Sequence, residues 1–184
     1  MFYLLSFSKM TYFKTLLFIL VAIHYSKRLF ETKYIHIFSN ATAPLIPATK
    51  NFFFYWIIFG TFAAIEILYL KDYEKKKSCM MCKLYNTLLV TVFLISELLN
   101  MFCHIKLRQL RTSSSYGEAT NVSNERKVPK GLFFDNVISP NYSFEILAWV
   151  SFVALSKSMW VTLFIICGAG IMYKWGCDKK RRLL

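Results

Sequence analysis

Acidic residues are scarce in this chain, which has 10 Asp and Glu against 23 Lys and Arg among 184 residues, giving a formal net charge of +13. Charged residues of both signs make up only 18% of the sequence, whereas hydrophobic residues make up 56% and aromatic residues 18%. A soluble domain of this length could hardly bury so much apolar surface. The composition therefore excludes an ordinary soluble domain and predicts an integral protein of the lipid bilayer.

Motifs that bind metals or dinucleotides are also lacking. The five cysteines are an odd number, and Cys103 and Cys167 fall within apolar stretches, which argues against a disulfide framework. Cys79-Met-Met-Cys82 is a single CxxC motif without a second pair or nearby histidines, so no metal site is predicted. Gly168-Ala-Gly170 follows no predicted strand and is interpreted as a helix-packing feature rather than a dinucleotide fingerprint.

The basic excess lies mostly beside apolar stretches. In a soluble chain such an excess would suggest nucleic acid, but here membrane head groups and an anionic cofactor are the expected partners, and no nucleic acid is expected. The apolar N-terminus has no A-x-A cleavage motif and is interrupted by Lys9 and Lys14, so we interpret it as a retained span.

Four apolar stretches are long enough to cross a bilayer, and they occupy residues 2–23, 52–70, 84–103 and 144–173. The last is too long for one span and is interrupted by Ser156-Lys-Ser158, so it fits two close helices, either as a hairpin or as two short spans. The predicted fold is therefore all-α. It is a single membrane domain over residues 1–184, a polytopic helical bundle of about five transmembrane helices with the last two as a close hairpin.

Two segments between the spans are predicted to be loops. Ser39 to Lys50 contains Pro44 and Pro47, and residues 112–135 form a polar loop rich in Ser, Thr and Asn. Alternation of the spans places the loops after the first and third spans, and the basic tail, on one side of the membrane. Within the second span, Glu66 must face protein, water or a cation, which favours a functional role.

The third span ends in polar residues at helical spacing, namely Glu97, Asn100, His104, Arg108 and Arg111. Intervals of three and four residues place all of them on one stripe of a helix. Such a stripe is either packed polar filling or the wall of a ligand cavity that becomes cationic toward one end. Ionisable residues inside a membrane favour the cavity.

Two further groups of polar residues lie at the ends of spans. His24, Arg28 and Glu31 share a helix face, with Tyr25 on an adjoining one, and the alternative reading is an ordinary basic collar with an interfacial tyrosine. Pro140 suits the first position of a helix, and Asn141 and Glu145 would then lie on one face of its start. That start could hold a ligand, or simply be capped by its own carboxylate.

Four blocks in order over residues 20–182 resemble the steroid 5α-reductase family, and within it the very-long-chain trans-2-enoyl-CoA reductase branch. They are His24-Tyr-Ser-Lys-Arg28 with Glu31, Phe38-Ser-Asn-Ala-Thr-Ala-Pro-Leu45, Asn100-Met-Phe-Cys-His104 leading to Leu107-Arg-Gln-Leu-Arg111, and Pro129-Lys-Gly-Leu-Phe133 followed by Pro140-Asn-Tyr-Ser-Phe-Glu145 and Trp149. The resemblance implies NADPH-dependent reduction of a long-chain trans-2-enoyl-CoA to a saturated acyl-CoA, the last step of very-long-chain fatty acid elongation. It also implies an endoplasmic reticulum membrane location, with the active site and the 112–135 loop facing the cytosol.

The same resemblance implies roles for individual residues. Tyr25 matches the tyrosine that donates a hydrogen bond to the reacting carbonyl. His104 agrees with the enoyl reductase branch, since the steroid branch has an aspartate there. The residues expected to bind the cofactor are Asn100, His104, Arg108, Arg111, Asn141, Glu145, Arg28 and Arg181.

The chain departs from the family pattern in two respects that bear on activity. After the basic tail the family continues with a tyrosine and a hydrophobic end, whereas Leu183 stands here where the tyrosine is expected. The family places a glutamate, the partner of the carbonyl-binding tyrosine, on a helix upstream, and none of the 24 residues before Tyr25 is acidic. The alternative function is therefore a non-catalytic membrane subunit, or a degenerate paralogue of the same fold, that binds fatty acid elongation enzymes. A small transporter is disfavoured because the sequence has no internal repeat.

Overall fold

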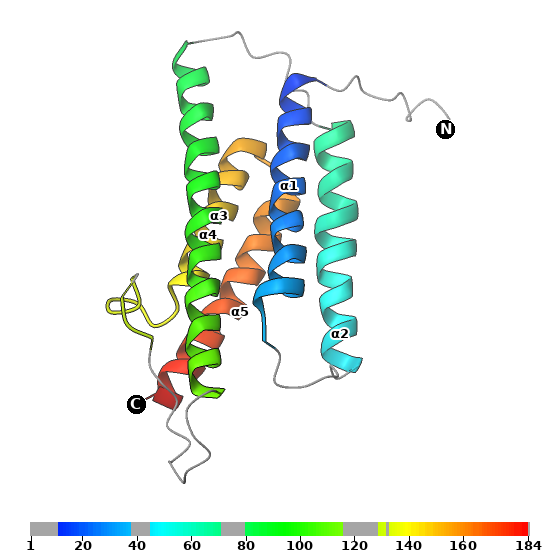
Figure 1. Cartoon of the computed structure of the whole chain (residues 1–184). Helices are drawn as coiled ribbons and strands as arrows, with labels where there is room; N and C mark the ends of the chain where they lie inside the picture. Colours follow the sequence, from blue (N-terminus) through cyan, green and yellow to red (C-terminus); the bar gives the residue numbers. More distant parts are fainter. Residues whose placement is uncertain (1–10, 38–44, 71–79, 116–128, 132, 184) are drawn as a thin grey trace.

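The computed structural model describes residues 11–37, 45–70, 80–115, 129–131 and 133–183, and within these it contains helices and no strand. The helices are α1 (Tyr12–Phe30) continuing as η1 (Glu31–Ile35), α2 (Leu45–Phe52) continuing through η2 (Phe53–Ala63) to η3 (Glu66–Leu70), α3 (Met80–Ser115), α4 (Pro140–Ser156) and α5 (Met159–Leu183). The η segments are π-helical. Each α-helix together with the η segments that continue it is called a rod below, which gives five rods. The predicted all-α membrane bundle is confirmed, and the rods stand roughly side by side (Figure 1).

Three of these rods are long and apolar enough to cross a membrane, over Ala48–Tyr69, Met80–Leu110 and Met159–Arg181. They expose large apolar side chains such as Trp56, Leu88 and Ile166, as expected of helices that face lipid. Helix α4 has only 17 residues, and α1 carries three basic residues within its 19. The short α4 and the charged α1 therefore differ from the three apolar helices. With three helices able to cross a bilayer, the chain is a multi-pass membrane protein.

Successive rods alternate in direction (Figure 1). Helices α1, α3 and α5 finish toward one end of the molecule, and α2 and α4 begin toward that same end. This is the arrangement that alternation of the spans predicts. The core lies where the helices meet and combines aliphatic side chains with buried aromatic ones, namely Phe59, Phe93, Trp149, Phe152 and Phe164.

The last two helices form the predicted hairpin. Pro140 occupies the first turn of α4 as expected, and α4 packs chiefly against α3 and then against α5. Lys157 ends α4 in the left-handed conformation, with φ of 50°, and its N–H donates to the Val153 carbonyl. A residue in this conformation reverses the chain after a helix, so α5 begins immediately at Met159.

Two predicted boundaries differ from the observed ones. Helix α2 begins at Leu45, so Pro47 lies in its first turn, where a missing N–H costs no helical hydrogen bond, rather than in a loop. Helix α3 runs on to Ser115, into the segment predicted as a polar loop from residue 112. The Phe38-to-Pro44 block, Cys79 and loop residues 116–128 lie outside the described residues.

Glu66 has a structural role that the sequence did not predict. Its buried carboxylate, on η3, accepts hydrogen bonds from the Ser158 hydroxyl, from the Met159 N–H at 3.0 Å and from the Trp160 N–H at 3.1 Å. The first N–H groups of a helix have no partner within it, and a carboxylate there also offsets the helix dipole. Glu66 therefore caps α5 from another rod and joins the α4–α5 hairpin to η3.

Replacing Glu66 with Leu is expected to lower the free energy of unfolding by about 1–3 kcal/mol, because the buried Ser158 hydroxyl and two partly buried N–H groups at the start of α5 lose their acceptor. Glu66→Gln keeps one acceptor oxygen and should lose less. Thermal unfolding in detergent micelles measures both. Asp178→Asn, at an exposed pair with Arg181, is the matched surface control and should change little. Equal stability of Glu66→Leu and the unaltered protein would contradict the capping role.

Candidate functional site

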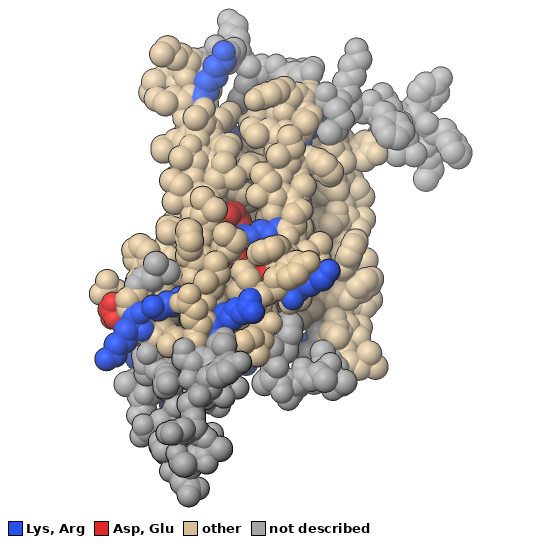
Figure 2. All heavy atoms as spheres, in the orientation of Figure 1, with Lys and Arg blue, Asp and Glu red and all other residues tan. Residues whose placement is uncertain are grey.

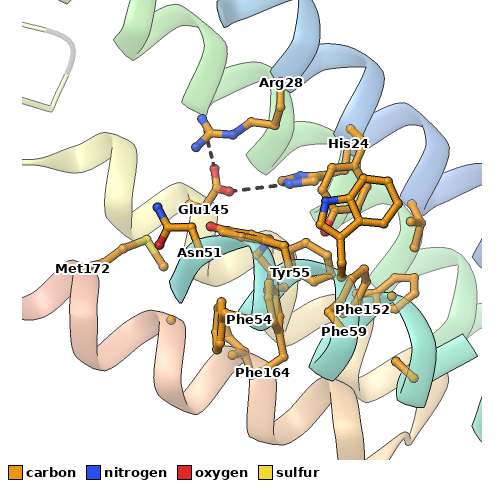
Figure 3. A pocket seen from close by; sticks show the side chains of 18 of the residues that line it. His24, Arg28, Asn51, Phe54, Tyr55, Phe59, Glu145, Phe152, Phe164 and Met172 are labelled. Carbon is orange, nitrogen blue, oxygen red and sulfur yellow. Dashed lines mark ion pairs between the residues drawn. The ribbon is translucent and has the colours of Figure 1, made fainter. Parts of the chain in front are cut away.

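A cavity of about 940 Å³ lies among α1, the helix formed by α2, η2 and η3, and helices α3, α4 and α5. Most of its wall is apolar and aromatic, and Phe54, Tyr55, Phe59, Phe152 and Phe164 are seen on it in Figure 3. Most of the polar side chains gather in one part of this wall, where α1 meets α3 and the start of α4, whereas Lys14 lies apart from them near the start of α1. A mostly apolar cavity with a few converging polar groups is the usual form of a small-molecule site.

Six of the nine predicted site residues line this cavity, namely Tyr25, Arg28, Asn100, His104, Asn141 and Glu145. They come from the predicted stretches on α1, α3 and α4, which the fold brings together. Three do not contribute described side chains to the wall. Arg108 is exposed and donates to the Tyr34 carbonyl, and the Arg181 side chain is 82% exposed and lies 3.8 Å from Asp178. The side chain of Arg111 lies outside the described part of the chain.

Glu145 is held at the cavity wall by two basic partners on α1. Its Oε1 lies 3.7 Å from His24 Nε2, and its Oε2 lies 3.9 Å from Arg28 Nη1 (Figure 3). Both separations exceed hydrogen-bond length, so neither contact uses up the carboxylate oxygens, which remain able to accept from a ligand. The second turn of α4 thus presents an acceptor at the cavity wall.

His24 is fixed from the other side by Glu97 on α3. Its Nδ1 lies 2.8 Å from Glu97 Oε1, and the second oxygen of Glu97 lies 2.8 Å from Lys27 Nζ. All three residues are nearly buried. In a low-dielectric interior a buried carboxylate is costly unless it is paired, so these contacts tie α1 to α3.

Arg28 begins a second chain of contacts. Its Nη1 lies 3.1 Å from Glu31 Oε2 and 3.3 Å from His104 Nε2. A guanidinium can only donate, so His104 Nε2 accepts and the ring hydrogen sits on Nδ1, which faces His36 Nε2 at 3.4 Å. Glu31, His36 and His104 are the only group among the described residues whose ligand atoms are near enough to hold a metal, within 4.8 Å. A protonated nitrogen and an adjacent cation fit this hydrogen-bonded chain better than a metal site.

Asn100 joins α3 to the start of α4. Its Nδ2 donates to the backbone carbonyl of Asn141 at 2.8 Å, and its Oδ1 accepts from Lys27 Nζ at 2.6 Å. Both asparagines are buried and both line the cavity. The polar stripe read from helical spacing in the sequence is therefore divided, since Glu97 and Asn100 point into the bundle whereas Arg108 is exposed.

Tyr25 stands where the polar and apolar parts of the wall meet. Its ring packs edge-on against His24, with ring centres 5.2 Å apart, and lies 6.0 Å from the ring of Phe59 on η2. Trp149 also packs against His24, at 4.8 Å. A phenol can donate a hydrogen bond while staying neutral, so the arrangement can stabilise negative charge that develops on a ligand oxygen in an apolar surrounding.

Sequence reasoning missed several residues of this wall. Asn51 and Tyr55 point into the cavity (Figure 3), and their spacing of four residues on one helix is the signal that would have paired them. These two residues lie within a run of aromatic residues, which made the segment read as a simple apolar span. His24 was recognised on a helix face but not assigned to the site, although it contacts Glu97 and lies near Glu145.

Basic side chains gather on the surface near this part of the molecule. In the face shown in Figure 2, most Lys and Arg lie toward the end where α3 and α5 finish. An anionic ligand that reaches the cavity from that end would meet favourable charge.

Comparison with known proteins identifies a family and several similar reductases. The family model described as 3-oxo-5-alpha-steroid 4-dehydrogenase matches residues 41–182. The chain is 35% identical over 161 residues to a very-long-chain enoyl-CoA reductase of Dictyostelium discoideum. The matched residues are 88% of this chain and 49% of the relative. It is 34% identical to a protein named as an enoyl reductase in Schizosaccharomyces pombe, over 91% of this chain and 52% of the relative. It is 33% identical to a protein named as a very-long-chain enoyl-CoA reductase in Caenorhabditis elegans, over 88% of this chain and 50% of the relative.

The chain thus spans about half the length of the curated relatives it matches. No solved structure matches it. The family model nevertheless covers well over half of this chain, including α3, α4 and almost all of α5, which carry Asn100, Asn141 and Glu145. The chain therefore belongs to the family of 3-oxo-5-alpha-steroid 4-dehydrogenases, the steroid 5α-reductases.

Proposed function

We propose that this protein reduces long-chain trans-2-enoyl-CoA to saturated acyl-CoA with NADPH, the last step of very-long-chain fatty acid elongation. The observation that carries the proposal is the convergence of Tyr25, Asn100 and Glu145, from three separate helices, on one largely apolar cavity. The names of the relatives support the same substrate class. They also support the enoyl reductase branch over the steroid branch, as does His104.

The chemistry of the polar wall fits the nicotinamide end of NADPH. Asn100 and Asn141 offer amide groups, and Glu145 offers carboxylate oxygens, which match the donors and acceptors of a carboxamide. His104 and Arg28 border the same region. Arg108 and Arg111, farther along α3, and Arg181 on α5 are the proposed contacts for the phosphates, since guanidinium groups bind phosphate through paired hydrogen bonds.

Tyr25 is the proposed catalytic residue. When bound, NADPH would supply a hydride for the β-carbon of the enoyl thioester. Negative charge then gathers on the thioester oxygen, and the Tyr25 hydroxyl donates a hydrogen bond to it. The packing of Tyr25 against His24 and Phe59 restrains the phenol and keeps water from its ring, so that little reorganisation is needed when the charge forms. A proton at the α-carbon completes the reduction.

The apolar wall suits the acyl chain. Leu17, Val21 and Ile67 are among its apolar members, and the lipid-facing helices would let a chain enter from the bilayer while its CoA head stays in water. The proposed location is the endoplasmic reticulum membrane, with the polar end of the cavity toward the cytosol. Other fatty acid elongation enzymes are the proposed protein partners.

Purified protein in detergent is expected to oxidise NADPH only when a long-chain trans-2-enoyl-CoA is present. Tyr25→Phe should lower kcat by about 10²–10³-fold, because a hydrogen bond to the developing oxyanion is lost. Absorbance of NADPH measures both. Tyr12→Phe is the matched control, since Tyr12 lies on the same helix, is 88% exposed and does not line the cavity.

Folded protein without turnover would overturn the enzymatic proposal. If such protein also failed to bind NADPH but still co-purified with elongation enzymes, the alternative of a non-catalytic membrane subunit or degenerate paralogue would be supported instead.

Arg111→Ala is expected to weaken NADPH binding about tenfold or more, because a charge-assisted hydrogen bond to phosphate is removed. Arg181→Ala should have a smaller effect, since the Arg181 side chain is largely exposed outside the cavity wall. Titration of tryptophan fluorescence with NADPH compares the two. A larger loss at Arg181 than at Arg111 would show that the phosphates lie on α5 rather than on α3.

A further inference from the structure

Lys27 is a nearly buried basic residue on α1 that does not line the cavity. Its side chain is only 9% exposed, and its ammonium group lies 2.6 Å from Asn100 Oδ1, 2.8 Å from Glu97 Oε2 and 3.5 Å from Glu31 Oε1. The ammonium group donates hydrogen bonds to Asn100 Oδ1 and, at 3.5 Å, to the Glu97 backbone carbonyl, whereas Glu97 Oε2 and Glu31 Oε1 are its ion-pair neighbours. The shortest contact is to the neutral amide and not to either carboxylate.

The contacts of Asn100 determine which way its amide points. A lysine can only donate and a backbone carbonyl can only accept, so Oδ1 must face Lys27 and Nδ2 must face Asn141. An amide nitrogen carries two hydrogens, and the Asn141 carbonyl takes one of them. Because Asn100 is also part of the cavity wall, its second N–H is the group that it can offer to a ligand. Asn100 therefore presents a donor and not an acceptor.

We propose that Lys27 is a positioning residue that holds the Asn100 amide with its donor toward the cavity. This inference rests on the proposed function, because the acceptor that it would serve is the carboxamide oxygen of the nicotinamide, with Glu145 accepting from the carboxamide NH2. Without Lys27 the buried Oδ1 of Asn100 loses its donor. The amide is then held by its hydrogen bond to the Asn141 carbonyl alone, so it can tilt and its second N–H is no longer fixed in the direction of the carboxamide oxygen.

A purely structural role for Lys27 is the main alternative, because the same ammonium neutralises Glu97. Removing Lys27 alone would leave that carboxylate with less positive charge beside it and could unfold the bundle. The double variant Lys27→Met/Glu97→Gln removes the charge from both partners and keeps similar volumes. It therefore leaves no uncompensated carboxylate at position 97, and Glu97→Gln alone, which alters the His24 contact but keeps Lys27, shows how much of any loss comes from His24.

The experiment measures two dissociation constants for each protein, one for NADPH and one for 2′-phospho-ADP-ribose, the corresponding compound without nicotinamide. In Lys27→Met/Glu97→Gln, NADPH binding should weaken about tenfold, the size of one hydrogen bond. Binding of 2′-phospho-ADP-ribose should be unchanged, since it does not reach Asn100. Lys33→Met is the matched control, because Lys33 is exposed on η1 and lies outside the cavity wall.

A preference for NADPH that stays the same in the double variant, or an equal loss for both ligands, would overturn the positioning role. If the double variant does not fold, Asn100→Asp serves instead. It keeps an oxygen for Lys27 but has no N–H, so it should lose the preference, and retention would overturn the inference. Equal binding of both ligands by the unaltered protein would overturn the placement of the nicotinamide against Asn100, and absence of NADPH binding would overturn the proposed function, so both results are distinct from failure of Lys27 alone.

Discussion

Buried carboxylates impose the main constraint on this bundle. The side chains of Glu31, Glu97 and Glu145 lie inside the bundle, where each residue is at most 9% exposed, whereas many of the exposed side chains are large and apolar. Each would be very costly in a low-dielectric surrounding unless a cation lay beside it. Lys27 and Arg28 on α1 supply that charge, and His24 bridges Glu97 to the side of Glu145. The position of α1 against α3 and α4 is therefore set by ion pairing as much as by apolar packing.

The same pairing explains why the cavity has two kinds of wall. On the side where α1 faces α3 and α4, the charges and amides satisfy one another and leave a few groups directed inward. On the opposite side, η2 and α5 contribute rings such as Phe54 and Phe164, whose centres are 4.7 Å apart. Tyr25 lies between the two. A ligand with a polar reacting group and an apolar chain matches this division, and the aromatic packing keeps water from the polar contacts and so strengthens them.

Much of the fold could be predicted because it depends on local chain properties. Pro140 marked the start of α4, and Ser156-Lys-Ser158 marked the reversal between α4 and α5. Glu66 shows the limit of such reasoning. An acidic residue within an apolar stretch must have a partner, but the sequence did not show that the partner is the start of α5. Helix spacing likewise placed Glu97 through Arg111 on one stripe, without showing that Arg108 reaches the Tyr34 carbonyl instead of the cavity.

The sequence by itself determined that the chain is an all-α membrane protein, because composition and the length of apolar runs depend only on the order of residues. It also indicated which polar residues share a helix face. Only the tertiary structure decided which faces meet. The convergence of Tyr25, Asn100 and Glu145, the pairing of Lys27 with Asn100, and the place of Asn51 and Tyr55 in the cavity are contacts between separate rods. Such contacts depend on how the helices pack and on which buried charges neutralise one another, and helical spacing within a single segment carries no information about either.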